Sequence, residues 1–586
     1  MFMKLLKNKI KSIFGTVFEN QGLEPKEFEH LIQTPRDTNV CDLCIPCFSL
    51  AKIMKENPKI IAENLAKEFN DIMGSEVNVE ALNGYVNFLS DSKWLVKKIF
   101  VDNYCFFEQI NKNKILIEHT SANPNGPFHV GRARNAILGD ALVRLNRDLG
   151  NDVIAEYYVD DMGKQVGILS WALENISSEE VNQILKNNNM DDLNPIWKNK
   201  QDHVRVRWYQ AANILRRDNQ KIEDELTEII NKSEEGDEEV LQQFKNAFQP
   251  ILDGMLETLS ELGIKYDSFT NESKFIIDGT VNEIMKRLEK SNLYGEAENG
   301  AKFLELSGKG VSGKSTKFFF QRGDGSSLYA TRDLAYHQWK WGVSEKLINV
   351  LGEDHRLQSK QVSVALTELN IKCPEVVFYA FIKLPEGKMS TRKGNVVFMD
   401  DLIIEAQEMA LKILSERKSN LNDDKRVKIA KSVASSAIRF NILKVSPEKG
   451  FTFKWEDALS FDADSAPFIM YSHARSCSIH KKVKSLELKE VDLELSEIEI
   501  NESTSRLLRT ILRYEDAIEK SVSENKPNHF CSYMLELSTS YNLFYRDSPI
   551  IKDEQINKFN YNVSEYSRKL LFRGCNALGL IPLESM

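Results

Sequence analysis

The feature that most constrains the fold is a run near residue 114 in which a strand, a loop, a helix and a second strand follow one another. Residues 114–118 have the apolar character of a buried strand, and a loop rich in Asn, Pro and Gly comes next. A helix is expected to begin near Gly131, and residues 153–158 again have the character of a strand. Such a β-loop-α-β unit opens a parallel sheet with helices packed against it. The sequence therefore predicts an α/β core of the kind that binds nucleotides.

The rest of the chain predicts further domains around this core. Its 586 residues are too many for a single hydrophobic core. Residues 1–105 combine amphipathic helices with a short strand, which predicts an N-terminal α+β domain. The α/β core is expected to cover 106–405, interrupted by a helical insertion at about 164–270 and a hairpin at about 300–322. Residues 406–586 have a helical period almost throughout, which predicts an all-α bundle.

Composition excludes several classes of protein. A net charge of −9 is not that of a basic nucleic-acid coat, although a local basic surface can still bind RNA. No run approaches the roughly 18 apolar residues of a membrane span, so no membrane contact is expected. Eight cysteines do not make a disulfide framework here, and a reducing, cytoplasmic location is expected. Cys41, Cys44 and Cys47 lack a nearby fourth zinc ligand, so we expect small buried residues and no protein-bound metal.

One short stretch has the spacing of a phosphate-binding loop. Gly308, Gly313, Lys314 and Ser315 satisfy the pattern G-x-x-x-x-G-K-[ST]. That pattern binds phosphate only between a strand and a helix, whose N-terminus favours anions. The residues before it, "AKFLEL", and those after it, "STKFFFQ", both have the character of strands. The stretch therefore predicts the turn of a hairpin, and a helix directly after Ser315 would restore the phosphate-loop interpretation.

Two further stretches are better suited to phosphate chemistry. In "NPNGPFHVGR" the chain leaves a strand and presents His129 just before a helix, where Gly131 lets a ligand approach the backbone. His129 and Arg132 lie one helical turn apart and can reach the same phosphates. The stretch "LPEGKMSTRKGN" places Lys388 and other cations in one loop, which suits a pyrophosphate leaving group. If these stretches do not bind phosphate, His129 and Arg132 would be a helix cap or solvated residues, and the cations of the second stretch would be a solvated run of charges.

These two stretches resemble the paired signatures of class I aminoacyl-tRNA synthetases: "HVGR" is similar to their HIGH motif and "KMSTRKGN" to their KMSK loop. Further stretches resemble the arginyl-tRNA synthetases, and the resemblance covers essentially the whole chain. It is carried by "EHTSANPNGPFHVGRARNA", "YYVDDMGKQV", "GSSLYATRDLAY", "PFIMYSHARSCSI" and "LGLIPLESM".

The resemblance implies a multidomain α/β plus all-α fold. It comprises a Rossmann-type parallel-sheet catalytic core with a helical insertion, an N-terminal α+β additional domain that touches tRNA, and a C-terminal helical anticodon-binding bundle. The implied reaction joins L-arginine to ATP as arginyl-adenylate and then passes arginine to the terminal ribose of tRNA(Arg), at the 2′-hydroxyl in class I. Mg²⁺ would accompany ATP, and a monomer is expected.

The resemblance also assigns the substrate pocket. Glu118, Ser121 and Asn123 would bind the arginine substrate from the first strand and its loop, and Tyr329 and Asp333 would close on it from the other half. A guanidinium is a planar fork of donors, so its selection requires carboxylates and other acceptors in fixed directions. If the assignment is wrong, Glu118 would be a surface acid at a strand end and Asp333 a helix cap.

The remaining assignments concern ATP and catalysis. The residues assigned to catalysis are His129, Arg132, Lys388 and Lys393. Those assigned to ATP are Pro127, His129, Gly131, Arg132, Asp354, His355, Lys388, Met389 and Ser390. The HIGH region consists of Ala122, Asn123, Pro124, Asn125, Gly126, Pro127, Phe128, His129, Val130, Gly131 and Arg132.

Both motifs depart from the family pattern at their last position. Arg132 replaces the usual second His of the HIGH motif, and Thr391 takes the last KMSK position, so the cation that contacts pyrophosphate is left open. Three different functions compete with an arginyl-tRNA synthetase: another class I synthetase, a non-catalytic tRNA-binding paralogue, and the phosphate-loop nucleotidase.

Overall fold

The computed structural model describes residues 2–20, 24, 29–35, 41–102, 113–190, 192–311, 315–383, 397–416, 422–461, 464–486, 489–491 and 498–586. Packing divides the chain into two compact units. The first comprises residues 1–110, 460–577 and 581–586, and the second comprises 111–459 and 578–580. No helix in the described part of the chain is both long and apolar enough to cross a membrane.

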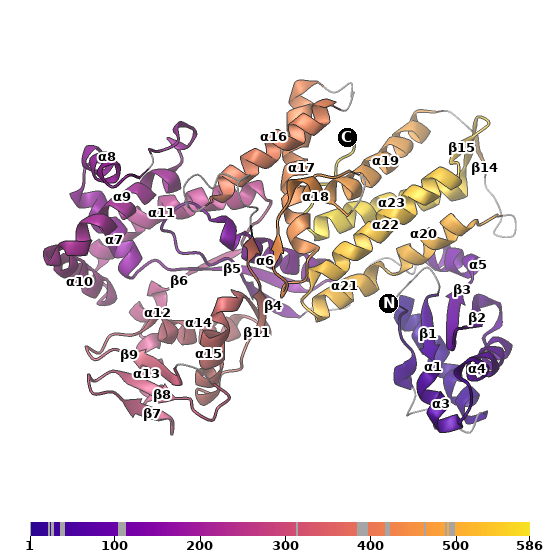
Figure 1. Ribbon diagram of the computed structural model, residues 1–586, viewed down its shortest axis with the longest axis horizontal. Coiled ribbons are helices and arrows are strands. Elements are labelled where there is room, and N and C mark those ends of the chain that lie inside the picture. Colours follow the sequence, from indigo (N-terminus) through magenta and orange to yellow (C-terminus); the bar gives the residue numbers. More distant parts are fainter. Residues whose placement is uncertain are drawn as a thin grey trace. The chain divides into compact units, whose positions relative to one another are not determined.

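The second unit is built on a five-stranded sheet in which every pairing is parallel (Figure 1). Its strand order is β11-β10-β4-β5-β6, so the direction of winding reverses between β4 and β10. This order is that of a doubly wound nucleotide-binding sheet, and the predicted Rossmann-type core is confirmed. The strands are β4 (Lys114–Glu118), β5 (Asp152–Val159), β6 (Ser268–Asn271), β10 (Lys346–Gly352) and β11 (Glu375–Tyr379).

Apolar runs explain why these strands and helix α6 (Val130–Asp148) pack together. Ile115 and Ile117 of β4 are buried with Leu138 and Leu142 of α6 in one core cluster. Strands covered on both faces need such continuous apolar runs, which is why the β-loop-α-β unit could be recognised in the sequence.

Helices α16 (Met399–Glu416) and α17 (Asp423–Leu443) belong to the second unit by packing. Arg439 of α17 is fully buried and donates to Asp140 of α6 at 2.5 Å, which ties the two helices together. The predicted domain border at 405/406 falls inside α16, whereas the change of unit comes after Leu459. The predicted division into three functional domains does not coincide with the two packing units, and its borders stay a prediction.

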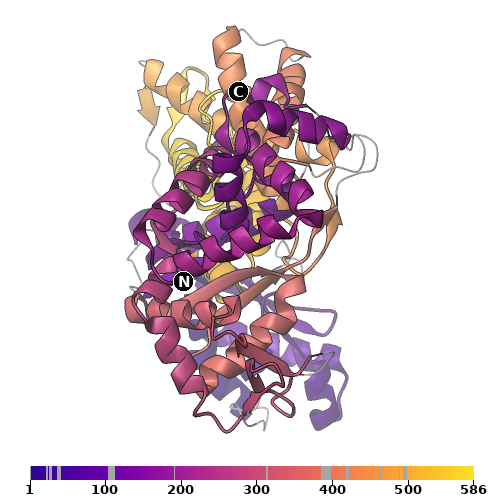
Figure 2. The same ribbon diagram turned by 90° about the vertical axis from the view of Figure 1, so that its left-hand side faces the viewer.

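A group of helices fills the predicted insertion between β5 and β6, and Figure 2 turns it toward the viewer. Its helices pack mainly on one another, with the closest packing among α7, α9 and α11. The strand β6 that follows them lies within the predicted helical range and was missed, because Phe269 is the single apolar residue of SFTN and gives no apolar run. The helices are α7 (Lys164–Asn175), α8 (Ser178–Asn187), α9 (Gln201–Leu215), α10 (Gln220–Glu234) and α11 (Glu238–Glu261).

The stretch with phosphate-loop spacing lies in an antiparallel hairpin, as predicted. Strand β8 (Lys302–Glu305) pairs with β9 (Lys317–Gln321), and β7 (Tyr294–Glu296) pairs on the other side of β8. A strand therefore follows Ser315 where a phosphate loop requires a helix, and that interpretation is rejected. Gly313 and Lys314 lie outside the described residues. Helices α12 (Ser273–Ile277) and α13 (Thr280–Leu288) precede these strands in the chain, and α14 (Tyr329–Val343) and α15 (Arg356–Glu368) follow them.

The N-terminal part of the first unit has the predicted α+β character. Helices α1 (Phe2–Asn20) and α4 (Pro58–Met73) pack together beside an antiparallel sheet of order β1-β3-β2. Cys41, Cys44 and Cys47 are buried there, as predicted. The strands are β1 (Leu43–Pro46), β2 (Val77–Leu82) and β3 (Tyr85–Ser90), and the shorter helices are α3 (Phe48–Met54) and α5 (Ser92–Val96).

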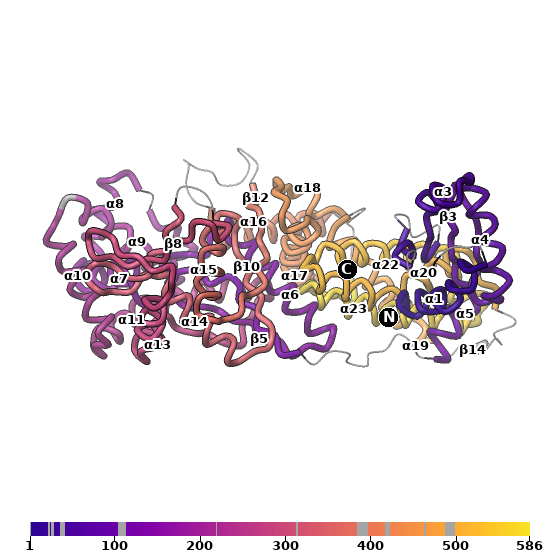
Figure 3. The backbone as a smooth tube through the Cα atoms, turned by 90° about the horizontal axis from the view of Figure 1, so that it is seen from below, coloured from indigo at the N-terminus to yellow at the C-terminus, as the bar shows by residue number. Residues whose placement is uncertain are grey.

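The C-terminal part of the first unit is the predicted helical bundle, and Figure 3 follows its backbone. Helices α19, α22 and α23 pack against one another. A small three-stranded sheet of order β14-β16-β15 accompanies them, which the helical period did not predict. The elements are α19 (Ala466–Ser485), β14 (Lys489–Val491), α20 (Glu502–Leu512), α21 (Tyr514–Ser523), α22 (Pro527–Asp547), β15 (Ile551–Lys552), β16 (Gln555–Asn557) and α23 (Lys558–Ala577).

Candidate functional site

Two neighbouring cavities lie in the second unit. The first, of about 620 Å³, is lined by residues at the carboxyl ends of β4 and β10, where the winding of the sheet reverses. Ligands of doubly wound sheets bind at this kind of crevice. The second, of about 450 Å³, is lined by the segment from Ala122 to His129 and by residues of α9 and α11. Asn123 and Arg132 line both cavities, so the two are adjacent.

The residues predicted to bind arginine all line the first cavity. Glu118 ends β4, Ser121 and Asn123 follow in the loop, and Tyr329 and Asp333 project from the first turns of α14. Tyr329 begins α14, so Asp333 lies inside that helix and is not its cap. The structure therefore brings together side chains that are more than 200 residues apart in the sequence.

The loop after β4 has an unusual backbone. Thr120 and Ser121 have φ angles of 69° and 39°, in the left-handed region that residues with a Cβ rarely adopt. The Thr120 amide donates to Asn135 Oδ1 at 2.6 Å, which helps to hold the turn. In this conformation Ser121 Oγ donates to Glu118 Oε1 and accepts from the Tyr158 amide, both at 3.1 Å. Such strain is retained where it positions functional groups.

Glu118 has a charged partner that sequence reasoning missed. Lys340 Nζ donates to Glu118 Oε2 at 2.8 Å and to Asn349 Oδ1 at 3.1 Å, and its side chain is 0% exposed. Asp333, His337 and Lys340 follow one another at helical spacing on α14, so they share a face of the helix. In the sequence, this spacing from Asp333 was the one indication that Lys340 could share the helix face of Asp333.

Asp333 is poised to remain ionised. Burial alone would raise the pKa of its carboxyl, but His337 and Lys340 outweigh burial and hold the pKa below its ordinary value. Its Oδ1 lies 3.2 Å from His337 Nδ1, while its side chain keeps 34% of its surface exposed. An ionised, accessible carboxylate on a cavity wall is a suitable partner for a cation.

His129 is the N-cap of α6, and this role fixes its tautomer. The Gly131 amide donates to His129 Nδ1 at 2.8 Å, so the neutral ring carries its proton on Nε2. Burial, followed by the charge of Arg132, lowers the pKa of His129. A Cβ on residue 131 would lie 2.8 Å from His129 Nδ1, so glycine permits this close approach. The second cavity is thus lined by a neutral histidine that can donate from Nε2.

The other predicted ATP and HIGH-region residues fall into three groups. Asp354 and His355 lie in the short turn η6 (Glu353–His355) after β10 and line the first cavity. Lys388, Met389, Ser390 and Lys393 lie outside the described residues. The HIGH-region residues that line the second cavity are Ala122, Asn123, Asn125, Gly126, Pro127, Phe128, His129 and Arg132, whereas Pro124, Val130 and Gly131 line neither.

The chain that follows the cationic stretch is attached to the HVGR segment. The Val130 amide donates to the Val397 carbonyl at 3.1 Å, and the Met399 amide donates to the Phe128 carbonyl at 2.8 Å. His129 and Phe398 thereby form an isolated antiparallel bridge. The start of α16 is therefore held beside the helix cap formed by His129.

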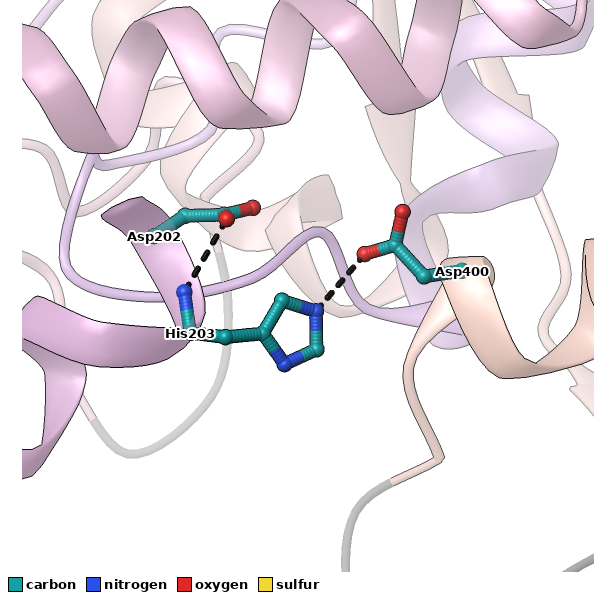
Figure 4. Close-up of side chains that lie close together, drawn as sticks. All are labelled: Asp202, His203 and Asp400. Atoms are coloured by element: carbon teal, nitrogen blue, oxygen red, sulfur yellow. Dashed lines mark hydrogen bonds and ion pairs between the residues drawn. The ribbon is translucent and has the colours of Figure 1, made fainter. Parts of the chain in front are cut away.

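Asp202 and His203 of α9 form a buried cluster with Asp400 of α16 (Figure 4). His203 Nε2 lies 2.9 Å from Asp400 Oδ2, and the candidate ligand atoms lie within 4.8 Å of one another. Lys200 Nζ, however, donates to Asp202 at 2.7 Å and to Asp400 at 3.1 Å. Because the Lys200 ammonium already bonds both carboxylates and offsets part of their negative charge, we interpret this cluster as a structural link between α9 and α16.

Family models match successive parts of the chain. The catalytic domain of the class I (R) tRNA synthetases matches residues 95–455, the DALR anticodon-binding domain matches 469–586, and the arginyl-tRNA synthetase N-terminal domain matches 2–89. The arginine–tRNA ligase of Methanocella arvoryzae is 39% identical over 549 residues, which are 92% of each chain. That of Archaeoglobus fulgidus is 35% identical over 593 residues and 100% of each chain.

Solved structures agree on the fold. The arginyl-tRNA synthetase of Thermus thermophilus superposes with a TM-score of 0.77 at 23% identity, covering 100% of both chains. The arginyl-tRNA synthetase of Plasmodium falciparum superposes with a TM-score of 0.74 at 18% identity, covering 99% of both chains. With catalytic, anticodon-binding and N-terminal family models all matching, and with relatives similar over the whole length, the chain belongs to the arginyl-tRNA synthetase family.

Proposed function

We propose that the protein charges tRNA(Arg) with arginine in two steps. In the first step a carboxylate oxygen of arginine attacks the α-phosphorus of ATP, the bond to the bridging oxygen breaks, and pyrophosphate leaves. In the second step the 2′-hydroxyl of the terminal ribose attacks the carbonyl carbon of arginyl-adenylate, and AMP leaves. Neither step needs a nucleophilic side chain, so positioning and stabilisation of phosphate charge supply the rate.

The observation that carries the proposal is the set of acceptors on the wall of the first cavity. Glu118, Tyr329 and Asp333 meet there from β4 and α14. A guanidinium offers five N–H donors in one plane, and a carboxylate can accept two of them in parallel. A lysine ammonium has no such planar fork, so these acceptors favour arginine.

The HVGR segment supplies donors for the phosphates. His129 is left with Nε2–H as its donor, because Nδ1 is occupied by the helix cap. Arg132 lines both cavities and can reach a phosphate placed between the amino acid and the helix. From the resemblance to the KMSK loop we assign Lys388 and Lys393 to pyrophosphate, and Met389 and Ser390 to ATP.

The remaining partners follow from the same assignment. Mg²⁺ would arrive with ATP, bound to its phosphates. Residues 1–105 and 406–586 would contact the outer corner and the anticodon of the tRNA, and the enzyme would act as a cytoplasmic monomer.

The test is aminoacylation of total tRNA with each of the twenty amino acids in labelled form. Only arginine should be transferred, and transfer should require ATP. Transfer of a different amino acid would identify another class I synthetase, and binding of tRNA without transfer of any amino acid would identify a non-catalytic paralogue.

A further inference from the structure

A buried carboxylate on the first cavity has an unsatisfied oxygen. Asp160 directly follows β5, is 9% exposed, and lines the cavity. Its Oδ1 has no hydrogen-bond partner among the described residues. A buried acceptor without a partner is unfavourable, so such groups in a native protein call for an explanation, and a missing ligand is one.

The surroundings of Asp160 leave room for a ligand. Tyr158, two residues earlier and therefore on the same face of the strand, also lines the cavity, and its Oη is buried without a partner in the described chain. A Cβ on residue 163 would lie 3.0 Å from Tyr329 Oη and 3.7 Å from Asp160 Oδ1. Gly163 therefore keeps open the corner in which Tyr329 and Asp160 meet.

Negative charge is incompletely neutralised in this corner. Burial, followed by the charge of Asp161, raises the pKa of Asp160 to about 7, although Arg332 lowers it. Arg332 is itself engaged by Glu272 at 2.6 Å and by Glu234. A cation that entered the corner would favour the ionised form of Asp160.

The next residue offers a matched comparison. Asp161 is also buried, but its Oδ1 accepts from the Ser273 amide at 2.9 Å and its Oδ2 from Ser273 Oγ at 2.5 Å. It does not line the first cavity. The two consecutive carboxylates therefore differ in what they face: Asp160 faces the first cavity, whereas Asp161 is bonded to Ser273 and lines a separate cavity beside α11.

We propose that Asp160 is a further arginine-binding residue whose Oδ1 accepts a hydrogen bond from the guanidinium of the substrate, beside Tyr329 and Asp333. The inference rests on the proposed function and deepens it. The residue is a specificity determinant because an ionised carboxylate at this position favours a cationic side chain over a neutral one of the same shape.

The first test compares Asp160→Asn with Asp161→Asn in aminoacylation. Asp160→Asn should lower kcat/KM for arginine by roughly 10- to 100-fold, the range expected for loss of a charged hydrogen-bond acceptor, with KM for ATP within about threefold. In Asp161→Asn, both kcat/KM for arginine and KM for ATP should stay within about threefold of the wild-type values. An unchanged kcat/KM for arginine in Asp160→Asn would overturn the inference. The proposed function would still hold in that case, provided that the wild-type protein charges tRNA with arginine.

The second test identifies which end of arginine is held. 5-Guanidinopentanoate has the guanidinium but lacks the α-amino group, and it can be used as a competitive inhibitor. Its inhibition constant should rise in Asp160→Asn by about the same factor as KM for arginine. An unchanged inhibition constant would show that Asp160 does not hold the guanidinium.

The third test needs no variant and covers the case in which Asp160→Asn does not fold. Asp161 and the Met162 amide face Asp160 from its own loop, and Arg332 and Tyr329 face it from α14. Glu272 lies beside Arg332, and burial, followed by the charge of Asp160, raises the pKa of Glu272 to about 8. Arginine binding should favour the ionised form of Asp160, whose pKa is raised in the free protein, and should therefore release protons near neutral pH. Calorimetric titration of the wild type in two buffers of different ionisation enthalpy measures this release, and its absence would overturn the inference.

Discussion

Three of the carboxylates that line the first cavity differ in their surroundings, and these surroundings determine what the removal of each carboxylate costs. Glu118 is paired with the fully buried Lys340, Asp333 is held ionised by His337 and Lys340, and Asp160 has an oxygen that the described chain leaves unsatisfied. Removal of Glu118 leaves the buried ammonium of Lys340 without its counter-charge, whereas removal of Asp333 mainly removes a contact to the substrate. The same substitution therefore affects stability at one position and specificity at the other.

Glu118→Ala should destabilise the protein by about 3–5 kcal/mol, because it leaves Lys340 buried without its counter-charge. The matched control is Glu375→Ala, which breaks an ion pair between Glu375 of β11 and Lys346 of β10 whose side chains are 51% and 34% exposed. That exposed pair should contribute about 0–1 kcal/mol. Urea unfolding of both variants measures the difference, and equal losses of unfolding free energy would show that Lys340 does not depend on Glu118.

Gly131→Ala should lower the rate of arginine activation by about 10- to 100-fold with little change in KM for arginine, because the new Cβ would displace the ring that donates to phosphate. That Cβ would lie 2.8 Å from His129 Nδ1. Gly342→Ala on α14 is the control, because a Cβ there would have nothing within 4 Å. Pyrophosphate exchange in the presence of tRNA measures the rate, and equal activity of the two variants would remove His129 from the mechanism.

Single residues were predictable where a motif carried them. His129, Glu118 and Asp333 were assigned from recognisable stretches, and the structure brings Glu118 and Asp333 to one cavity. Lys340 was missed, because its partner Glu118 is 222 residues away and only the folded chain brings the two together. Asp160 lies in a recognised stretch, but its neighbour Asp161 looks identical in sequence and only packing separates their roles.

At the scale of elements, a buried cluster joins the insertion to the start of α16. Lys200 donates to Asp202 and Asp400, and Asp400 also accepts from Thr258 Oγ1 at 2.7 Å. Burial alone would raise the pKa of Asp400, but His203, Lys200 and Thr258 outweigh burial and lower it. The cluster therefore holds α9, α11 and α16 together beside the segment that pairs with His129.

Asp400→Ala should destabilise the protein by about 2–4 kcal/mol, because it leaves Lys200 and Thr258 with an incomplete set of buried partners. Asp401→Ala, which removes one hydrogen bond of 3.3 Å from Trp197, should cost about 1 kcal/mol or less. EDTA should leave the thermal midpoint of the wild type unchanged, since Lys200 supplies the positive charge of the cluster. A midpoint that falls with EDTA and recovers with a divalent cation would make the cluster a metal site.

Elements with strong periodicity were predictable, and short ones were not. The unit β4–α6–β5 was recognised because its strands are continuous apolar runs and its helix is long. Strand β6 was missed because it has four residues, of which only Thr270 is buried. The strands β14, β15 and β16 are two or three residues long, so neighbouring helices dominate any periodic signal.

At the scale of the whole molecule, the second unit holds every described residue that we assign to arginine and ATP, and the first unit holds the N-terminal domain and most of the predicted anticodon-binding region. The net charge of −9 means that tRNA must be bound through local basic surface. We therefore expect KM for tRNA to rise with salt much more steeply than KM for arginine.

The central claim, that the first cavity selects arginine by its carboxylates, is tested most directly by kcat/KM for arginine in Asp333→Ala. Asp333 is accessible from the cavity and is held ionised, so its loss should remove a charged contact to the guanidinium. We predict a loss of about 30-fold or more, with KM for ATP within about threefold. Wild-type kcat/KM for arginine in this variant would contradict the account, because the guanidinium would then be bound elsewhere.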